Sequence, residues 1–415
     1  MSRPRVTIIG AGLAGLAAAV ALTQRGRAVT LVDAAAQAGG RCRSYLDPQL
    51  GVVIDNGNHL VLSGNRAVMD YLAAIGASDR LRGPDTADFA FVDVATRERW
   101  TIRPNTGRVP WWVLSPARRV PGTRAVDYLA LAKLLRAPAG QTLAEALPAR
   151  GALWQRLLEP FFVSALNTPA STASARLAGA IVRGTLAAGG DAYRPRIAHP
   201  TLAAAFVDPA LDWLRARGAE VRLGTRLRAL SFDGDRVAAL DFGDGPQALD
   251  GGVVLAVPPG VAADLVPGLV VPDEFHPIVN AHFLVGAPPG TPAILGVVGG
   301  TVEWIFAFDD RISVTVSAAD GLAGVDRETL ARRLWGDVAA ALSLPEALPR
   351  WQIVREQRAT FAATSAQDAR RPGARTRWRN LVLAGDWTQT GLPATIEGAV
   401  RSGNAAAALL STLPP

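Results

Sequence analysis

Residues 5–33 decide the fold, and they read RVTIIGAGLAGLAAAVALTQRGRAVTLVD. Residues 5–9 are short, β-branched and uninterrupted, which predicts a buried parallel strand. An Ala- and Leu-rich helix should follow until Gly26 ends it, and residues 28–32 predict a second strand that ends at Asp33. A strand, a glycine-rich turn, a helix and a second strand with a terminal acid are typical of a dinucleotide-binding unit.

The three glycines of the turn have distinct predicted roles. Gly10 makes the tight turn, Gly12 lets the backbone approach a pyrophosphate, and Gly15 permits close packing of the helix on the strand. The helix N-terminus offers free N–H groups and a positive dipole end to the phosphates. Asp33 is placed to accept hydrogen bonds from the adenosine ribose. We therefore expect the dinucleotide to contact Gly10, Ala11, Gly12, Leu13, Ala14, Gly15 and Asp33.

The uncharged stretch 6–24 follows two arginines and superficially resembles a signal peptide. The glycine spacing favours the dinucleotide site instead. The other long uncharged stretch, 277–302, contains three prolines and Gly290 between residues 288 and 292, so it cannot form one lipid-exposed helix. No transmembrane span is predicted.

Two further segments distinguish FAD from NAD. The sequence GGRCRS (39–44) follows the ribose acid, and a predicted strand (380–383) runs into AGDWT (384–388), before GLPATIEGA (391–399) opens a helix. This arrangement resembles the second flavin-binding segment of glutathione-reductase-like flavoproteins; an ordinary strand, turn and capped helix is the alternative. The resemblance implies an acid near the ribityl chain and a helix N-terminus at the N1–C2=O edge, where reduced flavin is negative. The expected contacts are Gly40, Arg41, Gly385, Asp386, Thr395 and Ile396.

The middle of the chain supplies a third part of the FAD site. A helix is predicted over 209–217, strands over 220–223 and 253–257, and a strand over 225–230 that continues into a hairpin. In the resembled flavoproteins, the residue at the position of Leu227 pairs its backbone with adenine.

These patterns predict an α/β fold with two domains, because 415 residues are too many for one hydrophobic core. A Rossmann-like, glutathione-reductase-like FAD-binding domain should comprise residues 1–81, 199–259 and 377–415. The intervening residues, 82–198 and 260–376, should form an α+β substrate-binding domain.

Composition limits the possible partners and the compartment. The formal charge is +7, with 43 basic and 36 acidic residues, and Lys133 is the only lysine. No nucleic-acid-binding signature or run of basic residues is present, so no nucleic-acid partner is expected, whereas a basic balance favours an anionic membrane surface. Cys42 is the only cysteine, which excludes an intrachain disulfide and a cysteine-rich metal site and favours the cytoplasm. We expect Cys42 to be a small packed residue, and we expect no metal.

The segment AGDWTQTGLPATIEGAVRSGNAAA (384–407) resembles the C-terminus of carotenoid desaturases and their bacterial relatives. Three other segments, 157–175, 194–206 and 358–387, resemble the squalene-associated flavoproteins regarded as hydroxysqualene dehydroxylases of hopanoid synthesis. The resemblance implies noncovalent FAD, a hydrophobic isoprenoid substrate and an electron donor for the flavin. It also implies that the hydroxyl of hydroxysqualene is protonated and leaves, that hydride from N5 of reduced flavin quenches the cation, and that an apolar tunnel excludes water.

The sequence does not single out the proton donor. DNGNH (55–59) matches the family pattern DxGxH, which approaches the flavin ring, so Gly57, Asn58 and His59 are expected cofactor contacts. His59 either donates the proton or positions the loop and the flavin.

Four other residues have two possible roles each. Glu159 and Asn167 either line the pocket or cap and brace a helix, and Trp304 and Phe306 face either the substrate or the core. Glu397 can stabilise the first turn of the flavin helix electrostatically.

Several other functions remain open. A carotenoid- or phytoene-type desaturase transfers hydride from a polyene to FAD, and direction is hardly visible in the sequence. An amine oxidase is disfavoured because many place a lysine near flavin N5 in the second half of the chain, and Lys133 is the only lysine. A non-catalytic prenyl-lipid escort of the same fold is disfavoured by the complete set of flavin motifs.

Residues 103–136 suggest membrane contact. Arg108 precedes Trp111, Trp112 and Leu114, further arginines and an apolar stretch (128–135) follow them, and Asp127 is the only acid. Tryptophan beside arginine suits a bilayer interface, so we expect peripheral association with the inner face of the membrane. Inward packing of this segment is the alternative.

Overall fold

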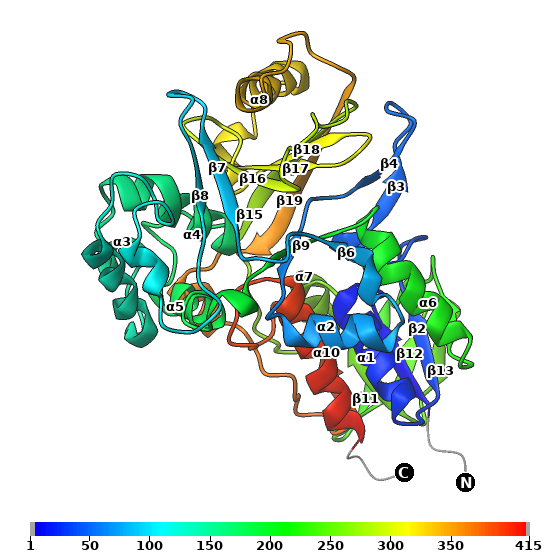
Figure 1. Ribbon diagram of the computed structural model, residues 1–415. Helices are drawn as coiled ribbons and strands as arrows, with labels where there is room; N and C mark the ends of the chain where they lie inside the picture. Colours follow the sequence, from blue (N-terminus) through cyan, green and yellow to red (C-terminus); the bar gives the residue numbers. More distant parts are fainter. Residues whose placement is uncertain (1–4, 412–415) are drawn as a thin grey trace.

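The computed structural model describes residues 5–411. The outermost four residues at each end of the predicted FAD-binding domain therefore lie outside the described residues. Figure 1 shows two large parts: one around α1, α10 and β2, next to both termini, and one around the strands β7, β8 and β15 to β19 and the helices α3, α4 and α5. Segments from the start, the middle and the end of the chain meet in the first part.

The first part is built on a five-stranded parallel sheet with the order β10-β2-β1-β14-β20. Its strands are β1 (Val6–Ile9), β2 (Val29–Val32), β10 (Glu220–Arg222), β14 (Gly252–Leu255) and β20 (Leu381–Leu383). Val6 pairs with Val29 on one side and with Gly252 on the other. The strands β1, β2, β14 and β20 are buried along almost their whole length, as expected for a parallel sheet covered on both faces. The predicted Rossmann-like arrangement is confirmed.

Helices cover this sheet. They are α1 (Leu13–Gln24), α2 (Arg66–Ala74), α6 (Asp208–Arg215), α7 (Pro259–Leu265) and α10 (Ile396–Ser411). The helices α1 and α10 pack so closely that a Cβ on Gly403 would lie 2.2 Å from the carbonyl oxygen of Ala14. Short helical turns η1 (Gly40–Cys42), η2 (Ser78–Arg80) and η7 (Ala203–Val207) adjoin them.

An antiparallel sheet, β11 (Ala229–Asp233), β12 (Arg236–Asp241) and β13 (Pro246–Ala248), lies beside the parallel sheet. The predicted strand over 225–230 was wrong in its first four residues, because only the last two belong to β11. The backbone N–H of Thr225 donates instead to the carbonyl oxygen of Asp33 at 2.8 Å, and that of Gly224 donates to Ala35. Residues 224–225 are thereby held against the loop after β2.

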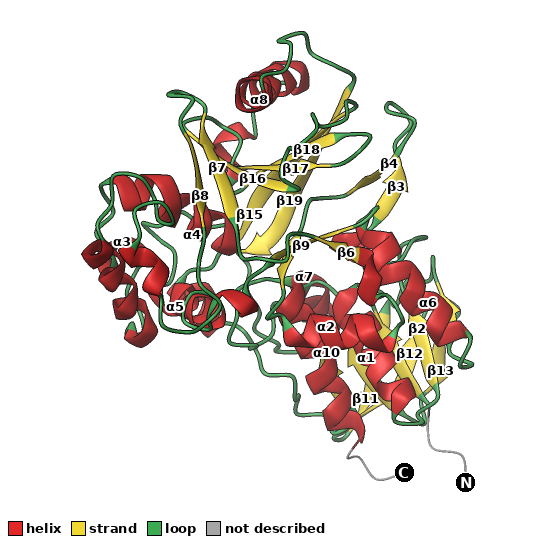
Figure 2. Cartoon of the chain, in the orientation of Figure 1, coloured by secondary structure: helices red, strands yellow, loops and turns green. Residues whose placement is uncertain are grey.

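The second part is built on a seven-stranded mixed sheet with the order β19-β15-β18-β17-β16-β7-β8 (Figure 2). Its strands are β7 (Phe89–Asp93), β8 (Arg99–Ile102), β15 (Phe275–Phe283), β16 (Ile294–Val298), β17 (Trp304–Ala307), β18 (Ile312–Val316) and β19 (Trp351–Phe361). The two faces of this sheet pack in different cores. Val279, Ala281 and Phe283 of β15 pack in one core with α8 (Arg327–Leu342), whereas Trp304 and Phe306 of β17 pack in another.

A helical layer completes that other core. It contains η3 (Trp111–Leu114), η4 (Ala125–Arg136), α3 (Leu143–Ala146), η5 (Trp154–Leu158), α4 (Glu159–Leu166) and α5 (Ala175–Gly184). The remaining elements are η6 (Gly190–Ala192), η8 (Ala319–Leu322) and α9 (Ser365–Ala369). No helix among residues 5–411 is long and apolar enough to cross a membrane.

Two small sheets lie where the two parts meet. One joins β3 (Ser44–Leu46) to β4 (Val53–Asp55), and the other has the order β5-β9-β6, from β5 (Leu60–Leu62), β6 (Leu81–Arg82) and β9 (Pro195–Ala198). The segment 55–59 connects β4 to β5 and therefore passes between the two large parts (Figure 1).

Candidate active site

The glycine-rich turn leaves open space at one of its three glycines. A Cβ on Gly10 would lie 2.4 Å from the carbonyl oxygen of Ala256, and one on Gly15 would lie 1.8 Å from that of Gly10, so the protein itself requires both glycines. Gly12 has an ordinary φ of −73°, and a Cβ there would meet no atom within 4 Å. Gly12 therefore has no neighbour in the protein that requires a glycine, and the space beside it fits a ligand at the N-terminus of α1.

Asp33 belongs to the same turn. Its carboxylate accepts hydrogen bonds from the backbone N–H groups of Ala11 at 2.6 Å and Ala35 at 2.8 Å. The side chain thus ties the end of β2 to the glycine-rich turn. It remains partly accessible, so lone pairs are left for a further donor.

The segments 39–44 and 384–388 meet beside this turn. Arg41 contacts both carboxylate oxygens of Asp386 at 2.7 Å and donates to the carbonyl oxygen of Ala359 at 2.6 Å. The charge of Asp386 raises the pKa of Arg41 above its usual value. Gly39 donates to Ala11 at 2.8 Å, and Gly385 donates to the hydroxyl of Ser402 in α10 at 3.0 Å.

Three other predicted positions lie around the parallel sheet. Leu227 is buried in the hydrophobic core beneath the antiparallel sheet. Thr395 accepts a hydrogen bond from the N–H of Gly398 at 3.0 Å and so caps α10, which begins at Ile396. Cys42 is a buried free thiol whose pKa is raised to about 12, first by burial, so it is a packed residue as expected.

The first residue of the segment 55–59 is structural. The buried carboxyl of Asp55 accepts hydrogen bonds from the hydroxyl of Ser44 at 2.6 Å and from the N–H of Leu202 at 2.8 Å. Burial raises its pKa. The carbonyl oxygen of Asp55 lies 3.1 Å from Nε2 of the buried His282, whose Nδ1 lies 2.7 Å from the hydroxyl of Ser313.

The next residues of this segment contact the mixed sheet. Nδ2 of Asn58 donates to the hydroxyl of Thr315 and to the carbonyl oxygen of Val314, both at 3.1 Å. The side-chain oxygen of Asn280 accepts from the Thr315 hydroxyl at 2.8 Å and from the N–H of Asn58 at 3.3 Å. A Cβ on Gly57 would lie 3.1 Å from Nδ2 of Asn280. The sheet thereby fixes the path of the segment.

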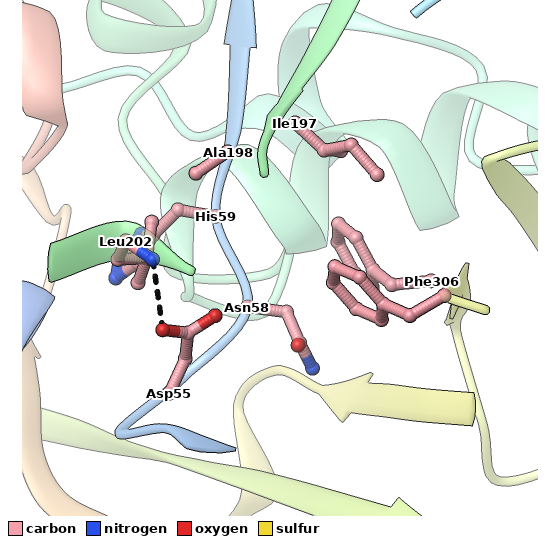
Figure 3. A pocket seen from close by; sticks show the side chains of 8 residues that line it. Asp55, Asn58, His59, Ile197, Ala198, Leu202 and Phe306 are labelled. Carbon is pink, nitrogen blue, oxygen red and sulfur yellow. Dashed lines mark hydrogen bonds between the residues drawn. The ribbon is translucent and has the colours of Figure 1, made fainter. Parts of the chain in front are cut away.

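His59 borders a small cavity at the end of this segment (Figure 3). Burial, and then the charge of Arg41, lower the pKa of His59 to about 4, so its imidazole is neutral at pH 7. The volume of about 10 Å³ admits roughly one water molecule, so this void by itself does not hold a long substrate. The cavity is lined by Asp55, Asn58, His59, Ile197, Ala198, Leu202, Phe306 and Phe308.

The structure also places Glu159, Asn167 and Glu397. Glu159 is exposed, and Asn167 braces the end of α4: its amide donates to the carbonyl oxygen of His276 at 2.9 Å, and its side-chain oxygen accepts from Ala318 at 2.6 Å. Glu397 is buried and caps the start of α2, because its carboxylate accepts from the N–H of Val68 at 3.1 Å.

Trp304 and Phe306 share one face of β17. Trp304 donates from its indole N–H to the hydroxyl of Ser164 at 2.6 Å, and both aromatic side chains belong to the core under the helical layer. Phe306 alone of the two borders the cavity beside His59 (Figure 3).

Sequence reasoning missed two buried residues that organise the site. Arg371 forms an ion pair with Asp368 at 3.0 Å and donates to the carbonyl oxygens of Asp386 and Leu392, so it holds the segment 386–392. Nothing in its local sequence marks it. Asn280 did leave a signal, because two polar residues, Asn280 and His282, stand two apart in the otherwise apolar strand IVNAHF.

The segment 103–136 divides its side chains between surface and core. Trp111, Leu114 and Leu129 are 66%, 60% and 69% exposed, whereas Trp112 is only 4% exposed and packs edge-on against Tyr128 with ring centroids 5.3 Å apart. The prediction grouped both tryptophans at one interface, and Trp112 belongs instead to the core.

Known proteins share both the sequence and the fold. A family model of flavin-containing amine oxidoreductases matches residues 13–411. Hydroxysqualene dehydroxylases of Zymomonas mobilis and Rhodopseudomonas palustris are 51% and 53% identical, covering 97% and 98% of this chain and 98% of each relative.

Solved structures share the fold at much lower identity. A putrescine oxidase variant has a TM-score of 0.72 at 18% identity, covering 99% of this chain and 100% of that chain. Cyclohexylamine oxidase of Brevibacterium oxydans has a TM-score of 0.68 at 18% identity, with 98% of each chain covered. The match to the family model and the near full-length identity to those relatives show that the chain belongs to the flavin-containing amine oxidoreductases, in the branch of the hydroxysqualene dehydroxylases.

Proposed function

We propose that this protein removes the hydroxyl group of hydroxysqualene and replaces it with a hydride from reduced FAD, giving squalene. The observation that carries this proposal is the identity of 51–53% to hydroxysqualene dehydroxylases over nearly the whole of both chains. A prenyl-lipid escort that had lost its flavin would not need the open space at Gly12.

The cofactor we propose is FAD, bound without a covalent bond. Cys42 is the only cysteine and is buried, and a thiol with a pKa raised to about 12 is a poor nucleophile. The proposed FAD contacts are the turn 10–15, Asp33, Gly40, Arg41, Gly57, Asn58, His59, Leu227, Gly385, Asp386, Thr395 and Ile396. The proposed FAD-binding domain comprises residues 1–81, 199–259 and 377–415, and the strand order of the parallel sheet supports this division.

The residues of the chain suit the chemistry of a cationic intermediate. Bound reduced flavin supplies the hydride. Phe306, Phe308 and Ile197 present apolar side chains to the cavity beside His59, and apolar walls disfavour the water that would otherwise recapture the cation. His59 is neutral at pH 7, which suits a hydrogen-bonding residue that orients its neighbours better than it suits a proton donor.

The substrate we propose is a lipid, and we propose that the enzyme collects it at a membrane surface. Six of the ten large hydrophobic residues that are exposed among residues 5–411 belong to the stretch 109–135: Val109, Trp111, Leu114, Val126, Leu129 and Leu135. Arg108, Arg124, Lys133 and Arg136 accompany them, and this balance of charge suits anionic lipids. An electron donor that reduces the flavin completes the set of proposed partners.

The decisive experiment is anaerobic turnover by the reduced holoenzyme. Hydroxysqualene should yield squalene while the flavin becomes oxidised, and no oxygen should be needed. In deuterated buffer, where N5 exchanges its hydrogen with solvent, one deuterium should appear in the product in place of the hydroxyl. The proposal fails if reduced enzyme leaves hydroxysqualene unchanged; dehydrogenation of a polyene by oxidised enzyme would then favour the desaturase alternative.

A further inference from the structure

Glu303 is a carboxyl group inside the protein that no part of the site described so far uses. It directly precedes β17, and one of its oxygens accepts hydrogen bonds from the hydroxyl of Ser164 at 3.2 Å and from the N–H of Ser317 at 2.9 Å. Ser164 also accepts the indole N–H of Trp304 at 2.6 Å. The carboxyl is therefore held in one position by groups from α4, β17 and the end of β18.

Burial raises the pKa of Glu303 to about 7, and the hydrogen bonds from Ser317 and Ser164 only partly oppose this rise. The titratable groups on the elements packed around it include Glu159 at the exposed start of α4 and the pair of His276 and Asp320 between β15 and η8. They also include two residues of α8: Asp337, which accepts hydrogen bonds from the N–H groups of Thr301 and Val302, and Arg333, which donates to the hydroxyl of Thr301. None of these is among the causes of the raised pKa. A substantial fraction of Glu303 is therefore protonated near neutral pH and able to donate.

Glu303 also lies close to the segment proposed to approach the flavin. Trp304 pairs in register with Thr315, and the hydroxyl of Thr315 accepts a hydrogen bond from Asn58 at 3.1 Å. The backbone N–H of Glu303 donates to the carbonyl oxygen of the same Thr315 at 3.2 Å. One sheet position therefore links Glu303 to the segment 55–59.

The side chain of Glu303 is not sealed in the core. Part of the residue remains accessible, although burial dominates its pKa, and its neighbours Trp304 and Phe306 are apolar and buried. Its carboxyl lies between α4, which provides Ser164, and the mixed sheet, whose Phe306 borders the cavity beside His59.

We propose that Glu303 is the proton donor for the leaving hydroxyl, an inference that rests on the proposed dehydroxylation. In this step the proton of Glu303 passes to the hydroxyl oxygen, and the C–O bond breaks with its electron pair on oxygen, so that water leaves. A hydride from the reduced flavin, carrying two electrons, forms the new C–H bond. The carbon is reduced, the flavin is oxidised, and the carboxylate regains its proton from solvent.

The test compares Glu303→Gln with Glu159→Gln, the same substitution at the exposed end of α4. Glutamine retains an oxygen that can accept from Ser164 and Ser317, so FAD content and thermal unfolding should match those of the wild type. The rate of squalene formation in a single turnover should fall about a hundredfold or more in Glu303→Gln, a size typical of general acid catalysis, and should stay unchanged in Glu159→Gln. An equal rate in Glu303→Gln and wild type overturns the proposal.

Two further readouts separate an acid from a merely structural residue. The wild-type rate should fall as the pH rises above about 7, because Glu303 then loses its proton, and Glu303→Gln should lack this decline. The formate ester of hydroxysqualene, whose leaving group departs without protonation, should react at similar rates with both proteins. A persistent defect with the ester shows that the residue is structural.

Infrared difference spectra keep the proposal testable if the wild type shows no turnover. Adding hydroxysqualene to the oxidised holoenzyme should shift the carbonyl band of a protonated carboxyl, and this band should be missing in Glu303→Gln. A band shift without turnover contradicts the proposed dehydroxylation and therefore also the role of Glu303 as its acid. It would still show that Glu303 contacts the alcohol. No shift removes that contact, whatever the turnover.

Discussion

Arg41 and Asp386 are 345 positions apart in the chain, and Nη2 of Arg41 lies 2.7 Å from each carboxylate oxygen of Asp386. The pair connects the loop after the first dinucleotide-binding strands to the loop after the last parallel strand. Both residues are proposed contacts of FAD, so the pair orients two segments of one binding site. Arginine suits this role because it carries several N–H donors: Nη2 contacts Asp386 while Nη1 donates to the carbonyl oxygen of Ala359.

Replacing Arg41 by Ala should weaken FAD binding by about ten- to a hundredfold, the size expected when charge-assisted hydrogen bonds are lost. Titration of apoprotein with FAD, followed by flavin fluorescence, measures the change. Arg379→Ala is the control, because Arg379 forms a long and exposed pair with Asp235 at 3.5 Å. If both variants bind FAD equally well, the ion pair has no role in the site.

Gly12→Val should abolish retention of FAD without unfolding the protein. The new side chain meets no protein atom within 4 Å at its Cβ, so the apoprotein tolerates it, whereas the added carbons fill the space proposed for the pyrophosphate. Gly336→Val in α8 is the matched control, because a Cβ at Gly336 also meets nothing within 4 Å. Absorbance of the purified proteins reports the flavin content. Full flavin content in Gly12→Val contradicts the assignment of this turn.

The triple variant Trp111→Ser, Leu114→Ser and Leu129→Ser should bind vesicles containing anionic phospholipid at least tenfold more weakly. The expected loss is large because each CH₂ removed from a membrane contact costs about 0.8 kcal/mol. Binding of the wild type should also weaken as salt is raised. Co-sedimentation measures both effects, and FAD content should not change.

The control for this variant is Val261→Ser with Val270→Ser, two exposed residues outside the stretch 109–135. Trp112 is left intact, because it packs in the core and its removal would confuse loss of binding with loss of stability. Equal sedimentation of the triple variant and the wild type leaves these side chains without a membrane role.

His282 should make the stability of the protein fall as the medium becomes acidic. Burial lowers its pKa in the folded protein to about 4, from the ordinary value of 6.5. Below pH 6.5 the unfolded chain therefore takes up a proton that the folded protein does not, and the free energy of unfolding decreases until about pH 4. The full effect is about 3 kcal/mol, from about 1.4 kcal/mol for each pH unit.

The raised pKa values of Asp55 and Glu303 act in the opposite direction over part of this range, so a comparison of variants is needed. His282→Gln should be less stable than the wild type at pH 7 because the imidazole contacts with Ser313 and with the carbonyl oxygen of Asp55 are lost. Urea unfolding should show this difference shrinking between pH 7 and pH 4.5. A constant difference means that His282 titrates normally in the folded protein.

The sequence alone determined the parallel sheet and the segments that we propose as contacts of the cofactor. Gly10, Gly15 and Asp33 could be assigned because the requirements of a tight turn and a close helix–strand contact are local, and local requirements leave a recognisable spacing. The strand before Gly385 was found in the same way, from a short apolar run with a glycine directly after it.

Only the tertiary structure decided which side chains meet across the chain. Glu303 lies 139 positions from Ser164, and Arg371 acts on carbonyl groups up to 21 positions away, so no periodic pattern records either contact. The same holds for exposure: Trp111 and Trp112 are chemically identical neighbours, and only packing in the core, where Trp112 meets Tyr128, buries one while the other stays in solvent. Burial in turn sets the pKa values of His59 and Glu303, because the cost of removing a charge from water depends on surroundings that distant segments provide.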